Sequence, residues 1–162
     1  MKTLIIYGTK HGTTKKIVNM IAKKMKVSDD VEIVNVKDIK NYNLRVFDRV
    51  IIGGSIHAGD IQKNIKKFCE ENKDELKEKQ LGLFITCMFK DKEVQEEQLN
   101  KAYSKELRDA SKTYSILGGE FLFEEMNFIE KMMVKIIAKT NKTISKIDKN
   151  AIDKFTKDML KK

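Results

Sequence analysis

The feature that most constrains this chain is a regular alternation of short apolar runs with longer amphipathic patterns. The short runs have the composition of β-strands, and the longer patterns repeat their apolar residues at helical spacing. Such an alternation is typical of a parallel α/β sheet, because parallel strands need crossover connections. The predicted strands are Thr3–Tyr7, Val31–Val36, Asp48–Gly54, Leu81–Cys87 and Thr113–Phe123, the last interrupted by Gly118 and Gly119. The predicted helices are Thr13–Met25, Ile61–Asn72, Glu93–Ala110, Glu125–Lys139 and Asp148–Leu160, and a polar link spans Asp38–Phe47.

The length and composition fit one domain over residues 1–162, with an added amphipathic helix at about 124–140. The chain has 162 residues, of which 41% are hydrophobic, enough for a full core. No stretch approaches the ~20 apolar residues that a membrane-spanning helix needs. The first residues enter a strand directly, without a signal-peptide layout. We therefore expect a cytoplasmic protein.

Five strands with crossover helices fit a doubly wound sheet with the order 2-1-3-4-5 and helices on both faces. This order places a ligand crevice at the carboxyl ends of the strands, near the switch point between the first and third. Three loops follow these ends, and we expect them to carry the function. They are Gly8–Thr14, Gly53–Asp60 and Thr86–Asp91.

The first loop, Gly8–Thr14, indicates a phosphate site. It runs directly into a helix, whose first backbone N–H groups attract an anion. Thr9, Thr13 and Thr14 can each donate a hydroxyl hydrogen bond, and Gly12 lets a phosphate approach the backbone. The alternative is a tight turn without a ligand.

The sequence lacks the motifs of several other protein classes that bind phosphate groups or are phosphorylated. The dinucleotide pattern GxGxxG is absent, and Thr13 follows Gly12 where a P-loop has lysine. A receiver domain would carry acidic residues at the end of the first strand, where this chain has Tyr7 and Gly8. A single phosphate held by backbone and hydroxyl groups is the remaining hypothesis.

The residues Thr9-Lys10-His11-Gly12-Thr13-Thr14 resemble the phosphate loop of the flavodoxins, usually written T-x-T-G-x-T, with His11 in place of the second threonine. The second loop resembles the flavodoxin loop that wraps the flavin ring. Its Gly53, Ser55, Ile56 and Gly59 also match a Gly-x-Ser-Ile-x-x-Gly pattern of the menaquinone-dependent protoporphyrinogen IX dehydrogenase family. That family carries an added segment before its last helix, where this chain has Phe123–Thr140.

The resemblance covers nearly the whole chain and implies a flavodoxin-like fold with FMN as the cofactor. The implied cofactor-binding residues come from all three loops. They are Thr9, Lys10, His11, Gly12, Thr13 and Thr14, then Ser55, Ile56, His57, Ala58 and Gly59, and finally Thr86, Cys87, Met88 and Phe89.

Three of these residues are candidates to flank the flavin ring, namely His57, Met88 and Phe89. Met88 and Phe89 could equally be core residues at the end of a strand. Cys87 could approach the ring, although a buried and inert thiol is the simpler interpretation.

Two redox functions remain open. The resemblance implies an FMN-dependent dehydrogenase of a porphyrinogen-like substrate with a quinone as electron acceptor. The alternative is a flavodoxin-type electron carrier that serves a redox partner protein, and a third hypothesis is a domain that kept the fold without the cofactor.

The predicted helix Glu125–Lys139 bears on this choice. It has a broad apolar face, and Lys131, Lys135 and Lys139 line another side. Such a helix can lie on an anionic membrane surface, where quinones are reached, which would make the protein peripheral at the inner face of the membrane. The alternative is that the apolar face packs on the sheet or beside the last helix.

Other functions find little support. The two cysteines and two histidines lack metal-ligand spacing, so no metal site is expected. The net charge of +9 comes from lysines spread among acidic residues, without interleaved aromatic residues. We therefore expect a solvated basic surface and no nucleic-acid partner.

Overall fold

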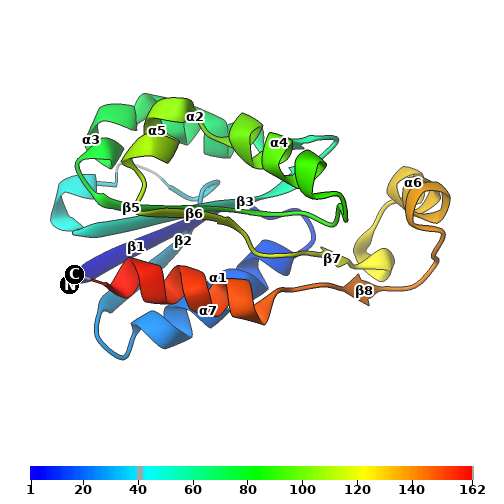
Figure 1. Ribbon diagram of the computed structural model, residues 1–162, viewed down its shortest axis with the longest axis horizontal. Helices are drawn as coiled ribbons and strands as arrows, with labels where there is room; N and C mark the ends of the chain where they lie inside the picture. The colour runs from blue at the N-terminus through cyan, green and yellow to red at the C-terminus, as the bar shows by residue number, and fades with distance from the viewer. Residues whose placement is uncertain (40–41, 162) are drawn as a thin grey trace.

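The computed structural model describes residues 1–39 and 42–161 and contains a parallel sheet with helices on both faces (Figure 1). The strands follow the order β2-β1-β3-β5-β6, which is the predicted order, and all neighbours along it are parallel. Residues 40 and 41 of the predicted polar link lie outside the described residues, and the link ends in the short helix η1 (Leu44–Val46). The strands are β1 (Lys2–Tyr7), β2 (Asp30–Asn35), β3 (Arg49–His57), β5 (Gln80–Thr86) and β6 (Thr113–Ile116).

The helices form two layers around this sheet. In Figure 1, α2 to α5 lie above the sheet and α1 and α7 lie below it. The helix bounds are α1 (Thr13–Met25), α2 (Lys63–Glu71), α3 (Lys73–Lys77), α4 (Lys92–Ala102), α5 (Lys105–Ala110) and α7 (Lys149–Leu160).

The alternation of side chains along each strand divides the core into two clusters. In β1, Leu4 and Ile6 belong to the cluster that contains Ile65 of α2. The intervening residue Ile5 belongs to the other cluster, with Ile17 of α1. Successive side chains of a strand point to opposite faces, so a strand covered on both faces must be apolar throughout.

The predicted helix Glu93–Ala110 is wrong in one respect, because it is two helices. Tyr103 has an extended backbone and a buried side chain between α4 and α5. Its hydroxyl lies 3.1 Å from the carbonyl oxygen of Ile52 and 2.7 Å from that of Phe84. Ser104 then caps α5 by accepting a hydrogen bond from the Leu107 amide. The anchoring of Tyr103 to the sheet interrupts the helix, a tertiary effect that helical spacing cannot reveal.

The third strand is longer than predicted and turns back on itself. β3 continues to His57 and pairs antiparallel with β4 (Asp60–Ile61). Ala58 and Gly59 form the turn, with φ values of 50° and 78°. Positive φ at both central residues is the mark of a tight hairpin turn that matches the strand twist. The helix predicted from Ile61 consequently begins at Lys63.

The predicted fifth strand, in contrast, is shorter than predicted and ends at Ile116. The chain bends at Gly118, where an added Cβ would lie 2.0 Å from the carbonyl oxygen of Lys146. It then forms a separate antiparallel ribbon of β7 (Glu120–Phe121) and β8 (Ile144–Ser145). Between these strands lie the short helix η2 (Phe123–Glu125) and α6 (Phe128–Ala138). We call residues 120–145 the lobe, and Figure 1 shows it beyond the carboxyl ends of the sheet strands.

Helix α6 begins at Phe128, three residues later than predicted, because Asn127 caps it. The Asn127 side chain accepts a hydrogen bond from the Glu130 amide, and the Glu130 carboxylate accepts one from the Asn127 amide, each at 3.0 Å. The alternative that the apolar face of α6 packs on the sheet or beside the last helix is wrong. Only Val134 is buried in α6 among the described residues. The exposed apolar side chains are Phe128, Ile129, Met132, Met133, Ile136 and Ile137.

Within the described ranges, no helix is both long enough and apolar enough to cross a membrane.

Candidate functional site

The three predicted loops meet at the carboxyl ends of β1, β3 and β5. Register brings Tyr7 beside Gly53, and Ser55 beside Thr86. The Thr14 and Thr86 hydroxyl oxygens lie 3.3 Å apart, which joins the first and third loops. The rings of His11 and His57 lie 5.9 Å apart between their centroids, which joins the first and second.

The first loop presents an uncapped helix N-terminus. Gly12 is the N-cap residue of α1 with φ 93°, a conformation that favours glycine, and no side chain caps the helix. The space where a Cβ of Gly12 would lie is open, with no atom within 4 Å. The first turn of α1 also holds no acidic residue. Its backbone N–H groups and the positive end of the helix dipole can therefore receive an anion.

The three threonines of this loop have different roles. The Thr9 hydroxyl oxygen accepts a 3.0 Å hydrogen bond from the Gly12 amide, which shapes the loop and leaves the Thr9 proton to donate. Thr14 is fully buried and faces Thr86. The Thr13 hydroxyl donates instead to the Glu120 carboxylate at 3.3 Å. The sequence did not indicate Glu120, which lies 107 positions away.

The second loop is fixed by Gln62, another residue that the sequence analysis missed. The Gln62 side-chain oxygen accepts a 3.0 Å hydrogen bond from the Ser55 amide, and its nitrogen donates to the Ser55 hydroxyl at 2.5 Å. That hydroxyl lies 3.0 Å from His57 Nε2. The network holds the His57 ring next to the first loop. Ile56 and Ala58, also predicted as cofactor contacts, flank His57 on the same hairpin.

The environment of His57 disfavours its charged form. Burial lowers the pKa of the His57 imidazole, and the positive charges of Lys10 and His11 lower it further, against a smaller opposing effect of Glu130. The neutral ring can serve as a hydrogen-bond donor or acceptor in the site.

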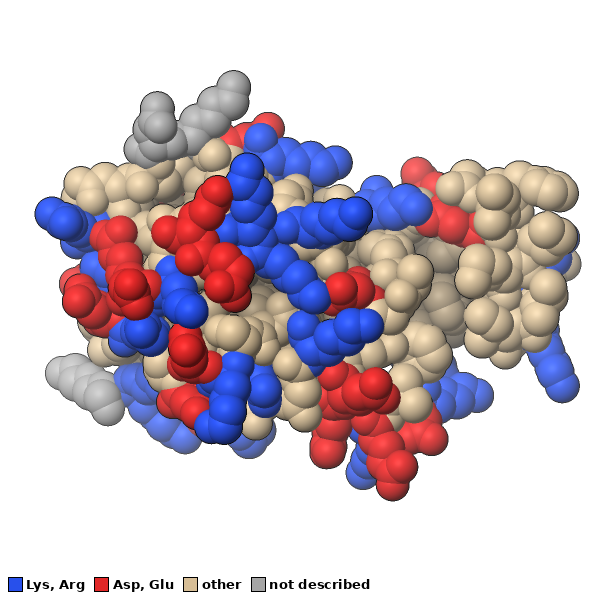
Figure 2. Space-filling view, turned by 90° about the horizontal axis from the view of Figure 1, so that it is seen from above, with Lys and Arg blue, Asp and Glu red and all other residues tan. Residues whose placement is uncertain are grey.

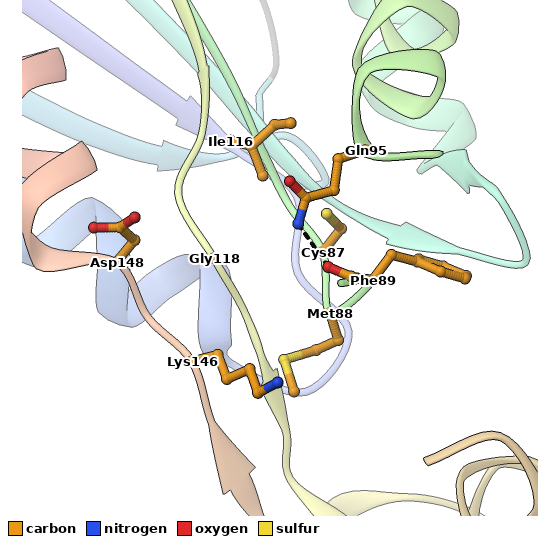
Figure 3. A pocket seen from close by; sticks show the side chains of 8 residues that line it. All are labelled: Cys87, Met88, Phe89, Gln95, Ile116, Gly118, Lys146 and Asp148. Atoms are coloured by element: carbon orange, nitrogen blue, oxygen red, sulfur yellow. Dashed lines mark hydrogen bonds between the residues drawn. The ribbon is translucent and has the colours of Figure 1, made fainter. Parts of the chain in front are cut away.

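The third loop lines a small cavity of about 170 Å³ (Figure 3). Cys87 is buried there, and burial raises the pKa of its thiol, which fits the inert-thiol interpretation. Phe89 is 46% exposed, so the interpretation as a core residue is wrong for it, and Met88 is half-buried. Gln95 of α4 steadies the loop by donating a 2.6 Å hydrogen bond to the Phe89 carbonyl. The other lining residues are Ile116, Gly118, Lys146 and Asp148.

The lobe reaches the first loop through a second glutamate. The Glu130 carboxylate of α6 accepts hydrogen bonds from Lys10 and from His11 Nε2, the latter at 3.2 Å. Burial alone would raise the pKa of Glu130, but bonds from Lys10, the Asn127 amide and His11 lower it to about 2. No local sequence signal could have found this contact, because Glu130 lies about 120 positions from its partners.

The sheet order, the crevice at the strand ends and the phosphate-type first loop together define a flavodoxin-like α/β protein. A family model described as a flavodoxin domain matches residues 4–148 of the chain. The chain belongs to this family, which bears out the fold and the FMN cofactor expected from the sequence.

Similar proteins include two named protoporphyrinogen IX dehydrogenase [quinone]. The one from Escherichia coli (strain K12) is 24% identical over 144 residues, covering 86% of this chain and 80% of the relative. The one from Leishmania major is 22% identical over 170 residues, covering 97% and 74%. Among solved structures, oxidised flavodoxin 1 from Bacillus cereus superposes with a TM-score of 0.59 at 12% identity, covering 98% of this chain and 95% of that chain.

Proposed function

We propose that this flavodoxin-fold redox protein is an FMN-dependent dehydrogenase of a porphyrinogen-like substrate that passes electrons to a quinone. The observation that carries the proposal is the lobe, which adds an exposed apolar helix face directly beside the flavin-type loops. The names of the two relatives, protoporphyrinogen IX dehydrogenase [quinone], support the same reaction class.

The residues of the first loop fit a phosphate. The open space above Gly12 and the uncapped start of α1 provide room and N–H donors. In the proposal, Thr9 and Thr14 add hydroxyl donors, Thr13 contributes its backbone amide, and Lys10 and His11 complete the loop. A single terminal phosphate suits this loop, as in FMN.

The flavin ring is proposed to lie between the second and third loops. Ser55, Ile56, His57, Ala58 and Gly59 would line one side, and the backbone at Gly59 is open, with no atom within 4 Å of an added Cβ. On the other side would lie Thr86, Cys87, Met88 and Phe89, of which Phe89 is the most exposed. A largely exposed aromatic ring next to a ligand site gains stability when a flat ligand covers it.

FMN, when bound, supplies the redox chemistry, since it takes up and gives back one or two electrons. The protein residues bind and orient it. His57 is held by Ser55 and Gln62 at the centre of the three loops, where it can hold or release a proton at Nε2. The positive charge of Lys10 lies nearby and is paired with the Glu130 carboxylate.

The quinone acceptor is proposed to be reached at an anionic membrane surface through α6. Figure 2 shows the lobe at the right with a mainly uncharged surface, unlike the body of the protein. Large exposed apolar patches mark interaction sites. Lys135 and Lys139 are exposed next to the apolar face, the arrangement of an interfacial helix.

The deciding experiment is turnover by the FMN-loaded protein with protoporphyrinogen IX and a menaquinone analogue. We expect oxidation of the substrate well above that produced by free FMN. The electron-carrier alternative, supported by the structural likeness to flavodoxins, predicts no such turnover and rapid reduction by a flavoprotein reductase. That result would overturn the dehydrogenase proposal.

A further inference from the structure

The lobe is attached to the phosphate loop by two glutamates at separate points. Glu130 accepts from Lys10 and His11, and Glu120 accepts from the Thr13 hydroxyl and from Lys16 Nζ, the lysine at 3.0 and 3.1 Å. The Glu120 side chain is only 5% exposed, whereas its partner Lys16 is 56% exposed. All side chains of residues 10–13 that can donate a hydrogen bond therefore donate one to the lobe.

Helix α6 contributes little buried surface to the lobe. It buries one residue, Val134, while six large apolar side chains remain exposed. Two short paired strands connect the lobe to the body, with Glu120 beside Ser145 and Phe121 beside Ile144. The position of α6 therefore depends strongly on the contacts of Glu120 and Glu130.

The donors used by the lobe differ from those available to a phosphate. The lobe binds the side chains of Lys10, His11 and Thr13. The backbone N–H groups at the start of α1 have no side-chain cap, and the Thr14 hydroxyl contacts Thr86 and not the lobe. An anion held by these backbone N–H groups would consequently not compete with the lobe for the same donors.

The charges agree with simultaneous binding. An unpaired carboxylate beside a phosphate would repel it. Here Glu130 is paired with Lys10 of the first loop and Glu120 with Lys16 of α1, so neither carboxylate is unpaired. The two glutamates neutralise positive charge that is already beside the loop, so any gain in phosphate affinity must come from the loop conformation that they fix and not from their charge.

We propose that Glu120 and Glu130 are positioning residues of the phosphate loop, and that docking of the lobe and binding of the cofactor phosphate strengthen each other. Each event fixes the loop conformation that the other requires. The coupling must be reciprocal. If docking of the lobe raises the affinity for phosphate by some factor, bound phosphate favours docking of the lobe by the same factor. This inference rests on the proposed binding of FMN by the first loop.

The first test compares flavin affinities of the apoprotein and its E130Q variant. We expect E130Q to bind FMN about tenfold more weakly, within the usual range of coupling between sites. Riboflavin lacks the phosphate, so its affinity should not change. Glu124→Gln is the matched control, because Glu124 lies in the same lobe, is exposed and makes no hydrogen bond or ion pair within the described part of the chain. Equal FMN affinities of E130Q and the parent would overturn the proposal.

The second test measures hydrogen exchange of α6 amides with and without FMN, and with inorganic phosphate as the minimal probe. In the parent, both should slow exchange over residues 128–138, and the effect should be lost in E130Q. Faster exchange would mean that phosphate displaces the lobe, and unchanged exchange would mean that the two events are not coupled. Either result overturns this inference and leaves the proposed function standing. A parent protein that binds no FMN overturns the proposed function and this inference with it.

Discussion

At the scale of single residues, the proposed phosphate site depends on Thr9 and Thr14. We expect the double variant Thr9→Ala, Thr14→Ala to bind FMN more weakly, by about 1.5–3 kcal/mol for each hydrogen bond lost to a charged phosphate. Isothermal calorimetry measures the loss. Because Thr14 is fully buried, riboflavin binding and thermal unfolding must be followed in parallel. FMN affinity equal to that of the parent would contradict the assignment of the phosphate to this loop.

His57 gives a second prediction at this scale, through pH. Burial, Lys10 and His11 lower the pKa of His57 in the folded protein, whereas the unfolded chain has an ordinary value of about 6.5. The unfolded state therefore binds more protons below neutral pH, and stability falls as pH falls through 6.5 toward the lowered value. His57→Gln cannot titrate, so its urea midpoint relative to the parent should rise between pH 7.5 and 5. A constant difference over this range would contradict the prediction.

At the scale of secondary-structure elements, α6 contains both exposed and buried apolar residues. Met132 is 48% exposed, so Met132→Lys should change the free energy of unfolding by no more than about 0.5 kcal/mol. Val134 is buried, and Val134→Lys forces a charge into an apolar contact. We expect this second variant to release the lobe, observed as faster proteolysis between residues 120 and 145. Equal proteolysis of both variants would show that Val134 does not hold the helix.

The elements also show what sequence can and cannot predict. Apolar residues at helical spacing predicted α1 with its observed bounds, because this pattern is local. The sheet order was predicted from the topology of doubly wound sheets, and the structure confirms it. The break at Tyr103 depends on hydrogen bonds to carbonyl groups of β3 and β5, which lie far away in the chain.

Tyr103→Phe should therefore cost about 1 kcal/mol of stability in urea unfolding, the usual net worth of one hydrogen bond. A change of midpoint within error would show that the hydroxyl contributes nothing.

The same limit applies to the candidate site. The three loops were found from their places after strands, and both histidines do lie within them. Gln62, Glu120 and Glu130 escaped detection because each acts across a contact that only the folded chain creates. Glutamates of the lobe look like ordinary surface residues in the sequence. Their partners on the first loop give them a role.

At the scale of the whole molecule, the last prediction concerns attachment to membranes. The net charge is +9, and the exposed apolar face of α6 lies beside exposed lysines. We expect the protein to sediment with vesicles of anionic phospholipid and much less with zwitterionic ones, since each lysine near an anionic surface adds ~1 kcal/mol. Added salt should release it, because ions screen this attraction over about 10 Å at 0.1 M.

Phe128→Ser with Ile136→Ser removes apolar contact while keeping the charge, and should weaken binding at every salt concentration. The matched control is Val27→Ser, a highly exposed apolar residue distant from α6 in sequence, which should bind as the parent does. Binding that follows salt alone and ignores the paired substitution in α6 would reduce the attachment to nonspecific charge and leave the apolar face without a membrane role.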